Sequence, residues 1–497
     1  MMWKIRTTKT GSGNIAVQVV ENSSHTVNII KHIGSAKNEE ELEDLKKLGS
    51  EYIEKHNLDS GFIPLFNDKK SSLISIDNLS VKESHHTFAY EFLSHIYNIN
   101  GFDNINDSIL RDLAIMRILE PVSKEESIRL LKEYFNVKYS HGDLHRGLKR
   151  ILEKKDKIEN VAVEYAKKTL NFDFSLVFYD VTNLYFESFK SDDFRQPGFN
   201  KDGKSMQPQV AIGLVVNQDG YPIAIDMFEG KKYEGHTFLL VILGLKEKYN
   251  IKTLTVVADA GMLSYKNMEE LNNEGISFIV GARLFQVDRD LLKEIVNKLN
   301  MKEGKYIESD TKYGALICDY SRKRASKDKS DREKQIKKAN YHIENPTKHK
   351  RPRFVLKLDK ENFELNTELI EFDKLKEGIK GYYTNLNNIS PQLIISRYHD
   401  LWHVEKAFRI TKGDLQARPI FHRKEDMIKT HILIVFVALC ISKLLELKTG
   451  LSIKVIKKNI FPIVDVVLID KLTKREFIKR QEFPDSDVFS KIKELYT

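Results

Sequence analysis

The chain reads SLVFYD at residues 175–180, an apolar run that ends in the carboxylate of Asp180. A second run, LTVVAD at residues 254–259, ends in the same way at Asp259. Short apolar runs of this kind are typical of buried strands. Carboxylates at strand ends can converge with one from a helix on a pair of Mg²⁺ ions, which activate water and stabilise both oxygens of an in-line phosphoryl displacement. The two runs therefore predict acidic metal ligands at the ends of two strands.

The segments around these runs predict the other elements of the fold. In chain order we expect strands at 175–180, 208–217 and 221–228, a helix at 236–248, a strand at 253–259, a helix at 263–274 and a strand at 276–282. Three consecutive strands followed by alternating helices and strands is the order of a ribonuclease-H-like core. The predicted fold class is therefore α/β, with a mixed sheet flanked by helices.

A third carboxylate, Glu405, lies in a segment at 390–415 that is predicted to be helical. Two helical turns take about seven residues, so Tyr398, Glu405 and Lys412 are expected on one face of that helix. Arg409 follows Glu405 by four residues, which is close enough to pair with it or to reach the same phosphate. The acid would bind metal and the bases would bind phosphate. An ordinary surface helix with ion pairs is the alternative interpretation.

The remaining sequence divides around this core by its patterns. We expect an N-terminal β-hairpin and helix at 1–80, a helical domain at 81–170 that either contacts DNA or is plain helical packing, a first part of the core at 171–285, a basic and largely β insertion at 286–380, a second part of the core with the glutamate helix at 381–450, and a C-terminal tail at 451–497.

Composition indicates a globular protein with an anionic partner. Of 497 residues, 41% are hydrophobic and 30% are charged, and the net charge of +9 suits a polyanion such as DNA. Two cysteines in so long a chain favour a reducing compartment without a disulfide framework. The longest apolar run, at 432–441, is half the length that a bilayer requires, and residues 1–5 lack the pattern of a signal peptide. We therefore expect a cytoplasmic protein that does not cross a membrane.

A dense run of positive charge lies within the expected insertion. Between residues 322 and 353 the chain has thirteen Lys or Arg and four acidic residues, and the run begins with Arg322, Lys323 and Arg324. One interpretation is a surface that binds DNA phosphates, and the other is a solvated helix and loop.

The segment GFNKDGKS at 198–205 matches the phosphate-loop pattern of nucleotide-binding proteins. That motif requires a strand before the loop and a helix after it, whereas an alternating apolar run follows here. We therefore expect no nucleoside triphosphate site, and interpret Lys201 and Lys204 as part of a basic loop near Asp180.

The sequence around Glu405, YHDLWHVEKAFRITK at 398–412, resembles the glutamate motif of bacterial insertion-sequence transposases of the DDE type with a YREK signature. Tyr398, Glu405 and Lys412 match its spacing. Leu401 stands where the signature has Arg, although some branches look as if they carry Leu-Trp there. The segments YDVT at 179–182, ADAGM at 258–262 and RPIFH at 418–422 resemble further motifs of this group in the same order.

This resemblance implies a DNA transposase with a ribonuclease-H-like core. Asp180, Asp259 and Glu405 would be the catalytic and metal-binding residues, with two Mg²⁺ or Mn²⁺ ions as cofactor. The protein would cut at the terminal inverted repeats of its element and join the ends to target DNA, as a homodimer in a synaptic complex. The residues expected to bind DNA are Tyr398, Arg409, Lys412, Lys201, Lys204, Arg322, Lys323 and Arg324.

Two other functions fit the same residues. A metal-dependent DNA nuclease without strand transfer would have the same active site. A non-catalytic DNA-binding protein derived from a transposase would keep the basic surfaces, but the presence of all three carboxylates counts against it.

Overall fold

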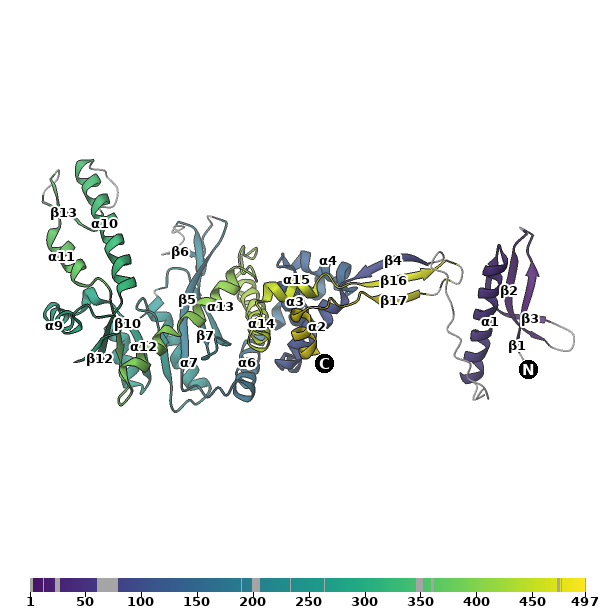
Figure 1. Ribbon diagram of the computed structural model, residues 1–497, viewed down its shortest axis with the longest axis horizontal. Helices are drawn as coiled ribbons and strands as arrows, with labels where there is room; N and C mark the ends of the chain where they lie inside the picture. Colours follow the sequence, from purple (N-terminus) through teal and green to yellow (C-terminus); the bar gives the residue numbers. More distant parts are fainter. Residues whose placement is uncertain are drawn as a thin grey trace. The chain divides into compact units, whose positions relative to one another are not determined.

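The computed structural model describes residues 3–11, 13–22, 27–59, 79–188, 190–198, 206–232, 234–262, 264–345, 352–358, 362–471, 474 and 476–496 (Figure 1). The chain forms two compact units. The first contains Met1–Phe92, Arg129–Lys138 and Lys457–Thr497, and the second contains Leu93–Ile128 and Tyr139–Ile456. The expected site residues belong to the second unit.

The N-terminal part of the first unit is a small sheet with one helix. Strands β1 (Trp3–Lys9), β2 (Ile15–Asn22) and β3 (Val27–Ala36) pair in an antiparallel sheet. Helix α1 (Glu39–Asp59) packs Leu45 against Val17 and Ala36 of this sheet. The expected helix is confirmed. In place of the expected two-stranded hairpin the chain forms a three-stranded sheet, because β3 also pairs with β2.

A second small sheet in the first unit joins distant parts of the chain. Strand β16 (Asp465–Asp470) lies between β17 (Glu476–Arg480) and β4 (Leu79–His85), and all three are antiparallel. The C-terminal helix α16 (Asp487–Tyr496) brings Phe489 against Phe88 at the start of α2 (Thr87–Ile99). Arg480 binds the carboxylate of Asp465 across the two C-terminal strands. The C-terminal segment is therefore held to the early part of the chain by pairing and packing.

The second unit is built on a sheet of nine described strands. Its order is β11-β12-β15-β10-β9-β5-β7-β6, with β8 paired to β7. The bounds are β5 (Val177–Tyr185), β6 (Gln196–Pro197), β7 (Pro208–Val216), β8 (Pro222–Glu229), β9 (Thr255–Ala258), β10 (Ser277–Ala282), β11 (Tyr306–Thr311), β12 (Gly314–Tyr320) and β15 (Ile379–Thr384).

The middle of this sheet confirms the predicted ribonuclease-H-like order. Strands β5, β9 and β10 are parallel, and β7 and β8 continue from β5 as an antiparallel meander. The turn at 217–220 ends with Gly220 at a φ of 77°, a conformation that glycine adopts without strain. Asn217 stabilises the turn, since its side-chain oxygen accepts the backbone N–H groups of Asp219 and Tyr221.

Helices cover both faces of the sheet, and alternating side chains of β5 show which helix lies on which face. Tyr179 packs against Phe238 of α7 (Glu234–Lys248). Its neighbour Phe178 lies near His403 of α13 (Trp402–Lys412) on the opposite face. Successive side chains of a strand point to opposite faces, so Asp180 faces α13 as Phe178 does. Helix α8 (Tyr265–Asn273) contacts α7, and α12 (Pro391–His399) contacts β9, β10 and β15.

A long buried helix, α14 (Glu425–Thr449), packs against α13 and β8. By length and composition α14 could cross a membrane, but 94% of its most apolar window is buried inside the protein, which is the environment of a core helix. Helices α3 (Ser108–Leu119), α5 (His141–Glu153) and α6 (Lys155–Thr169) also contact α14. Two further helices of the chain are α4 (Lys124–Phe135) and α15 (Ile453–Ile460).

The insertion between the two parts of the core is not largely β, and that expectation was wrong. It contains the helices α9 (Arg289–Leu299), α10 (Arg322–Glu344) and α11 (Thr367–Leu375), together with β11, β12 and the short hairpin of β13 (Val355–Lys357) and β14 (Phe363–Leu365). Most of the basic run is the single helix α10, which contacts α11, β13 and β14 through Ala339 and Phe354 (Figure 1). Lys and Arg form helices readily, and one apolar stripe is sufficient to attach such a helix.

Candidate active site

Asp180 and Asp259 are held next to each other by the central parallel strands. Tyr179 of β5 pairs with Ala258 of β9, and the two aspartates are the next residues on these strands. Neighbouring strands lie about 4.8 Å apart, so the two carboxylates are neighbours at the end of the parallel pairing. Both side chains are half-buried. The structure therefore brings together the first two predicted ligands.

The carboxylate of Asp259 is oriented by two donors. Its Oδ1 accepts the backbone N–H of Ala260 at 2.7 Å and the hydroxyl of Tyr398 at 3.0 Å. Burial, and after it the charge of Asp259, raises the pKa of Tyr398 above the ordinary range. The phenol therefore stays protonated and acts as a donor, and no group of the described residues donates to the other oxygen of Asp259.

Two further residues fix the backbone around Asp259. Arg283 donates from Nε to the carbonyl of Ala260 at 2.8 Å and from Nη2 to the carbonyl of Gly261 at 3.0 Å. Gly281 lets Tyr398 approach the sheet, since a Cβ at this position would lie 2.5 Å from the Tyr398 hydroxyl. The Tyr398–Asp259 contact thus requires the absence of a side chain on β10.

Glu405 lies on α13, but the helix around it differs from the prediction. The expected continuous helix at 390–415 is two helices, α12 and α13, joined by a turn at Asp400 and Leu401. Leu401 accepts hydrogen bonds from both Val404 and Glu405, and its own N–H bonds three residues back to Tyr398. Leu401 itself is buried. The helical prediction was therefore correct except for this two-residue turn, which seven-residue spacing did not reveal.

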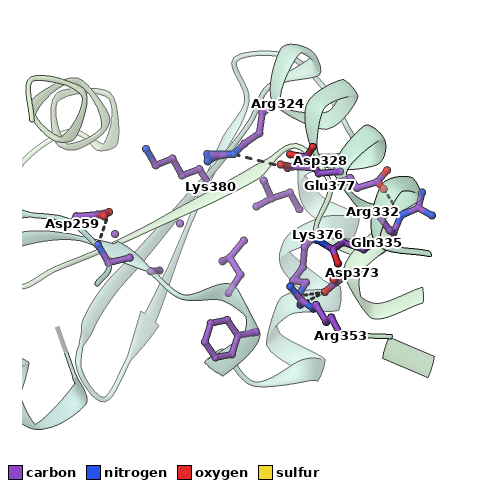
Figure 2. Close-up of a pocket in the computed structure, with 18 of the residues that line it drawn as sticks. Asp259, Arg324, Asp328, Arg332, Gln335, Arg353, Asp373, Lys376, Glu377 and Lys380 are labelled. Carbon is purple, nitrogen blue, oxygen red and sulfur yellow. Dashed lines mark hydrogen bonds and ion pairs between the residues drawn. The ribbon is translucent and has the colours of Figure 1, made fainter. Parts of the chain in front are cut away.

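A cavity of about 620 Å³ opens beside Asp259 and Tyr398. Its other walls come from β15 and from the insertion helices α10 and α11 (Figure 2). The cationic side chains that line it are Arg324, Arg332, Arg353, Lys376 and Lys380. The cavity next to the predicted acidic residues thus holds five cationic side chains together with the carboxylates of Asp259, Asp328, Asp331, Asp373 and Glu377.

The ammonium group of Lys380, on β15, interacts electrostatically with several carboxylates around the site. Burial, and after it the charge of Arg324, lowers the pKa of Lys380. The carboxylates of Asp259, Asp319 and Glu405 act in the opposite direction. Glu405 also contributes to the raised pKa of Tyr398, so Tyr398 and Lys380 both lie within electrostatic range of Asp259 and Glu405.

A comparison of the sequence with known protein families identifies the family of this chain. The family described as "Transposase DDE domain" matches residues 171–441, which is more than half of the chain. The chain is a member of the DDE transposase family. The match covers β5, β9 and α13; Asp180 lies on β5, Asp259 directly follows β9, and Glu405 lies on α13. It confirms the resemblance inferred from the motifs, and the YREK signature and bacterial origin remain predictions.

Solved structures similar to this transposase are distant. A piggyBac transposase synaptic complex with hairpin DNA is 10% identical, with a TM-score of 0.41 over 76% of this chain and 78% of that chain. A Mos1 transposase paired-end complex with a left transposon end is 11% identical, with a TM-score of 0.16 over 47% of this chain and 66% of that chain. No curated protein matches the chain. The family match therefore carries the assignment, and this transposase is an enzyme of DNA cleavage and strand transfer.

The predicted DNA-binding residues of this transposase lie in several places. Arg409 is exposed and Lys412 half-buried on α13, which also carries Glu405. Arg322, Lys323 and Arg324 form the first turn of α10, and Arg324 reaches the cavity beside Asp259. Lys201 and Lys204 lie outside the described residues. The phosphate-loop pattern that contains them leads into strand β7, in agreement with the interpretation that it is not a nucleotide site.

Sequence reasoning missed three residues beside the site of this transposase. Lys380 and Tyr382 alternate on β15, and Asp319 lies on the neighbouring strand β12. The hydroxyl of Tyr382 donates to Asp319 Oδ1 at 3.1 Å, and the rings of Tyr382 and Tyr398 are 4.9 Å apart. The pattern KGYYT at 380–384 indicates a strand, but no local signal shows that this strand borders the active site.

Proposed function

We propose that this transposase cuts DNA at the terminal inverted repeats of an insertion sequence and joins the ends to target DNA by two-metal-ion phosphoryl transfer. The observation that carries the proposal is the pair Asp180 and Asp259 on neighbouring parallel strands, with Tyr398 on Asp259. This pair faces α13, the helix that carries Glu405.

The donor set fits divalent ions of the magnesium type, which prefer carboxylate oxygens. Asp180 and Asp259 supply two neighbouring carboxylates. Glu405 is exposed, and among the described residues no three acidic, His or Cys side chains form a ready-made metal site. We therefore infer that Glu405 completes the ligand set when the ions and DNA bind. Bound Mg²⁺ or Mn²⁺ would activate the attacking hydroxyl and stabilise the leaving oxygen.

The protein's own residues would orient the reacting groups. Tyr398 holds the Asp259 carboxylate in one direction, and Arg283 holds the backbone behind it. Arg409 and Lys412 present positive charge on the helix of Glu405, where a DNA phosphate can pair with them. Joining two ends to one target requires two such sites held together, so we also propose a homodimer on paired DNA ends. We expect this assembly to act in the cytoplasm.

The test is cleavage and joining on linear DNA that carries the repeat flanking the element, in Mg²⁺. Wild type is compared with Asp259→Asn and with the matched variant Asp319→Asn. Asp319 is also a half-buried carboxylate that accepts a tyrosine hydroxyl, but it is not a proposed ligand. We expect metal-dependent nicks at the repeat boundary and joined products from wild type and Asp319→Asn, and binding without cleavage from Asp259→Asn.

Other outcomes would assign a different function. Nicks without joined products would identify a metal-dependent nuclease. Binding by wild type without cleavage in any metal would identify a DNA-binding protein derived from a transposase. Full cleavage by Asp259→Asn would remove Asp259 from the ligand set.

A further inference from the structure

Two cations outside the predicted glutamate helix lie together at the active-site cavity. Lys380 of β15 and Arg324 of α10 both line the cavity that contains Asp259. They also line a second cavity of about 430 Å³, whose other walls include Asp319 and His399. The pair therefore stands at the boundary between the active site and the insertion (Figure 2).

Most cations of the first cavity already have carboxylate partners. Arg332 binds Glu377 at 2.6 Å, and Arg353 and Lys376 bind Asp373 at 2.8 and 2.7 Å. These three cations share two carboxylates of the insertion itself, so each has an anionic partner. Their role in the free protein is to hold α10, α11 and the short hairpin together.

Lys380 and Arg324 differ from these three. Within the part of the chain that the structure describes, no carboxylate lies within 4.0 Å of the Lys380 ammonium, which rests 4.2 Å from the centre of the Tyr398 ring. Among the described residues, the one carboxylate that Arg324 reaches is that of Asp328, at the long distance of 4.0 Å. Two like charges are thus held near each other, partly buried, without close neutralisation. Such a pair is disfavoured until an anion binds between them.

We propose that Lys380 and Arg324 bind one backbone phosphate of the DNA strand on the insertion side of Asp259. The proposal rests on the proposed function and adds a phosphate contact that is independent of Arg409 and Lys412. Arg324 supplies a planar guanidinium that can donate two parallel hydrogen bonds, and Lys380 supplies a point charge. The bound phosphate would place the DNA over Tyr398, which the Lys380 ammonium already covers.

The test measures binding of the repeat duplex without divalent metal, so that cutting does not contribute. The variants are Lys380→Met, which keeps the chain length, and Lys380→Arg, which keeps the charge. The matched control is Lys376→Met, which removes one charge from the same cavity at a lysine that is already paired, and leaves Asp373 bound to Arg353. Melting temperatures of all variants establish that the fold is intact.

We expect Lys380→Met to bind about tenfold more weakly near physiological salt, with a slope of log K against log salt that is shallower by about 0.9. Lys380→Arg should restore the slope, and Lys376→Met should leave it unchanged. Duplexes with a single methylphosphonate at successive positions then locate the contact. One position should weaken wild type and have no further effect on Lys380→Met.

An unchanged slope in Lys380→Met, or equal changes in Lys380→Met and Lys376→Met, would overturn the proposal. Inorganic phosphate and an acidic peptide serve as competitors. If they displace the duplex equally well from wild type and from Lys380→Met, the proposal is also overturned. The outcome is separable from that of the proposed function. If wild type joins DNA in a metal-dependent reaction but the slope of Lys380→Met is unchanged, the proposed function stands and the phosphate contact is wrong. If the slope changes but wild type does not cleave DNA, the phosphate contact stands and the proposed function is wrong.

Discussion

The hydroxyl of Tyr398 lies 3.0 Å from Oδ1 of Asp259, although the two residues are 139 positions apart in the chain. One is at the end of α12 and the other directly follows β9. The contact joins the glutamate segment to the strand ends and orients the carboxylate that we propose as a metal ligand. Partners of this kind typically change metal affinity or activity by about 10–100-fold when they are removed.

Tyr398→Phe removes this hydrogen bond and keeps the ring against Tyr382. We expect cleavage to fall by about tenfold and the Mg²⁺ concentration for half-maximal cleavage to rise, because Asp259 loses its orienting donor. A Mg²⁺ titration of cleavage measures both. Tyr382→Phe is the matched control, since it loses the bond to Asp319 instead. Equal metal dependence in the two variants would contradict the role assigned to Tyr398.

Gly281→Ala should displace the Tyr398 hydroxyl, because the added Cβ would lie 2.5 Å from it. Overpacking of this kind typically costs about 1–3 kcal/mol. We expect a lower melting temperature and weaker cleavage. Adding Tyr398→Phe removes the clashing oxygen, so the double variant should recover most of the lost stability. Additive losses in the double variant would show that the clash lies elsewhere, such as at Ala260.

The exposed lysines at the start of α10 should contribute to DNA affinity. Lys323 and Lys327 line the second cavity, next to Arg324. We expect the double variant Lys323→Gln/Lys327→Gln to lower the slope of log K against log salt by about 1.8, since each released phosphate contact contributes about 0.9. Lys293→Gln/Lys298→Gln on α9, where both lysines pair with acidic neighbours, should change it little. If the two double variants have the same slope, α10 is a solvated helix and does not bind DNA.

The histidines packed around Lys124 should make the stability of the protein depend on pH. Lys124 Nζ lies 2.9 Å from Nδ1 of the buried His431, whose Nε2 lies 2.9 Å from the carbonyl oxygen of Ala417. Burial, and after it the charge of Lys124, lowers the pKa of His422 to about 4 and that of His431 well below 6.5. In the unfolded chain these histidines take up protons as the pH falls through about 6.5.

Between pH 6.5 and about 4 the unfolded state therefore binds more protons than the folded state, and the free energy of unfolding falls as the pH falls. We expect a melting temperature several degrees lower at pH 5 than at pH 7. His422→Gln should reduce this difference, because it removes one of the two histidines kept neutral. His32→Gln, at an exposed position of β3, is the control. A difference that is the same in wild type and His422→Gln would contradict the assignment.

The central fold was predictable because its signals are local. The run at 175–180 and that at 254–259 became β5 and β9, and the five predicted strands and two helices of the core all formed close to their expected bounds. Buried parallel strands have a continuous apolar pattern. Asp259 directly follows its strand as expected, whereas Asp180 does not end its strand, since β5 continues to Tyr185. The motifs around Asp180, Asp259 and Glu405 also gave the family correctly.

The surroundings of the site were not predictable in the same way. The turn at Asp400 and Leu401 divides the predicted helix into α12 and α13, and helical spacing gave no sign of it. The insertion contributes β11 and β12 to the main sheet beside β15, which places Asp319 and Lys380 near Asp259. Strand pairing between segments about sixty residues apart depends on register, and a shift by one residue would turn every side chain to the other face.

The sequence by itself predicted the element order of the core and the family correctly, and it pointed to the three carboxylates that we propose as ligands, because each depends on a short segment. Only the tertiary structure decided which side chains surround those carboxylates. Tyr398 can approach Asp259 because β10 has a glycine at position 281, and Asp373 and Glu377 of the cavity pair with Arg353, Lys376 and Arg332. Such relations depend on distances between elements, which are fixed by packing and not by any one stretch of the chain.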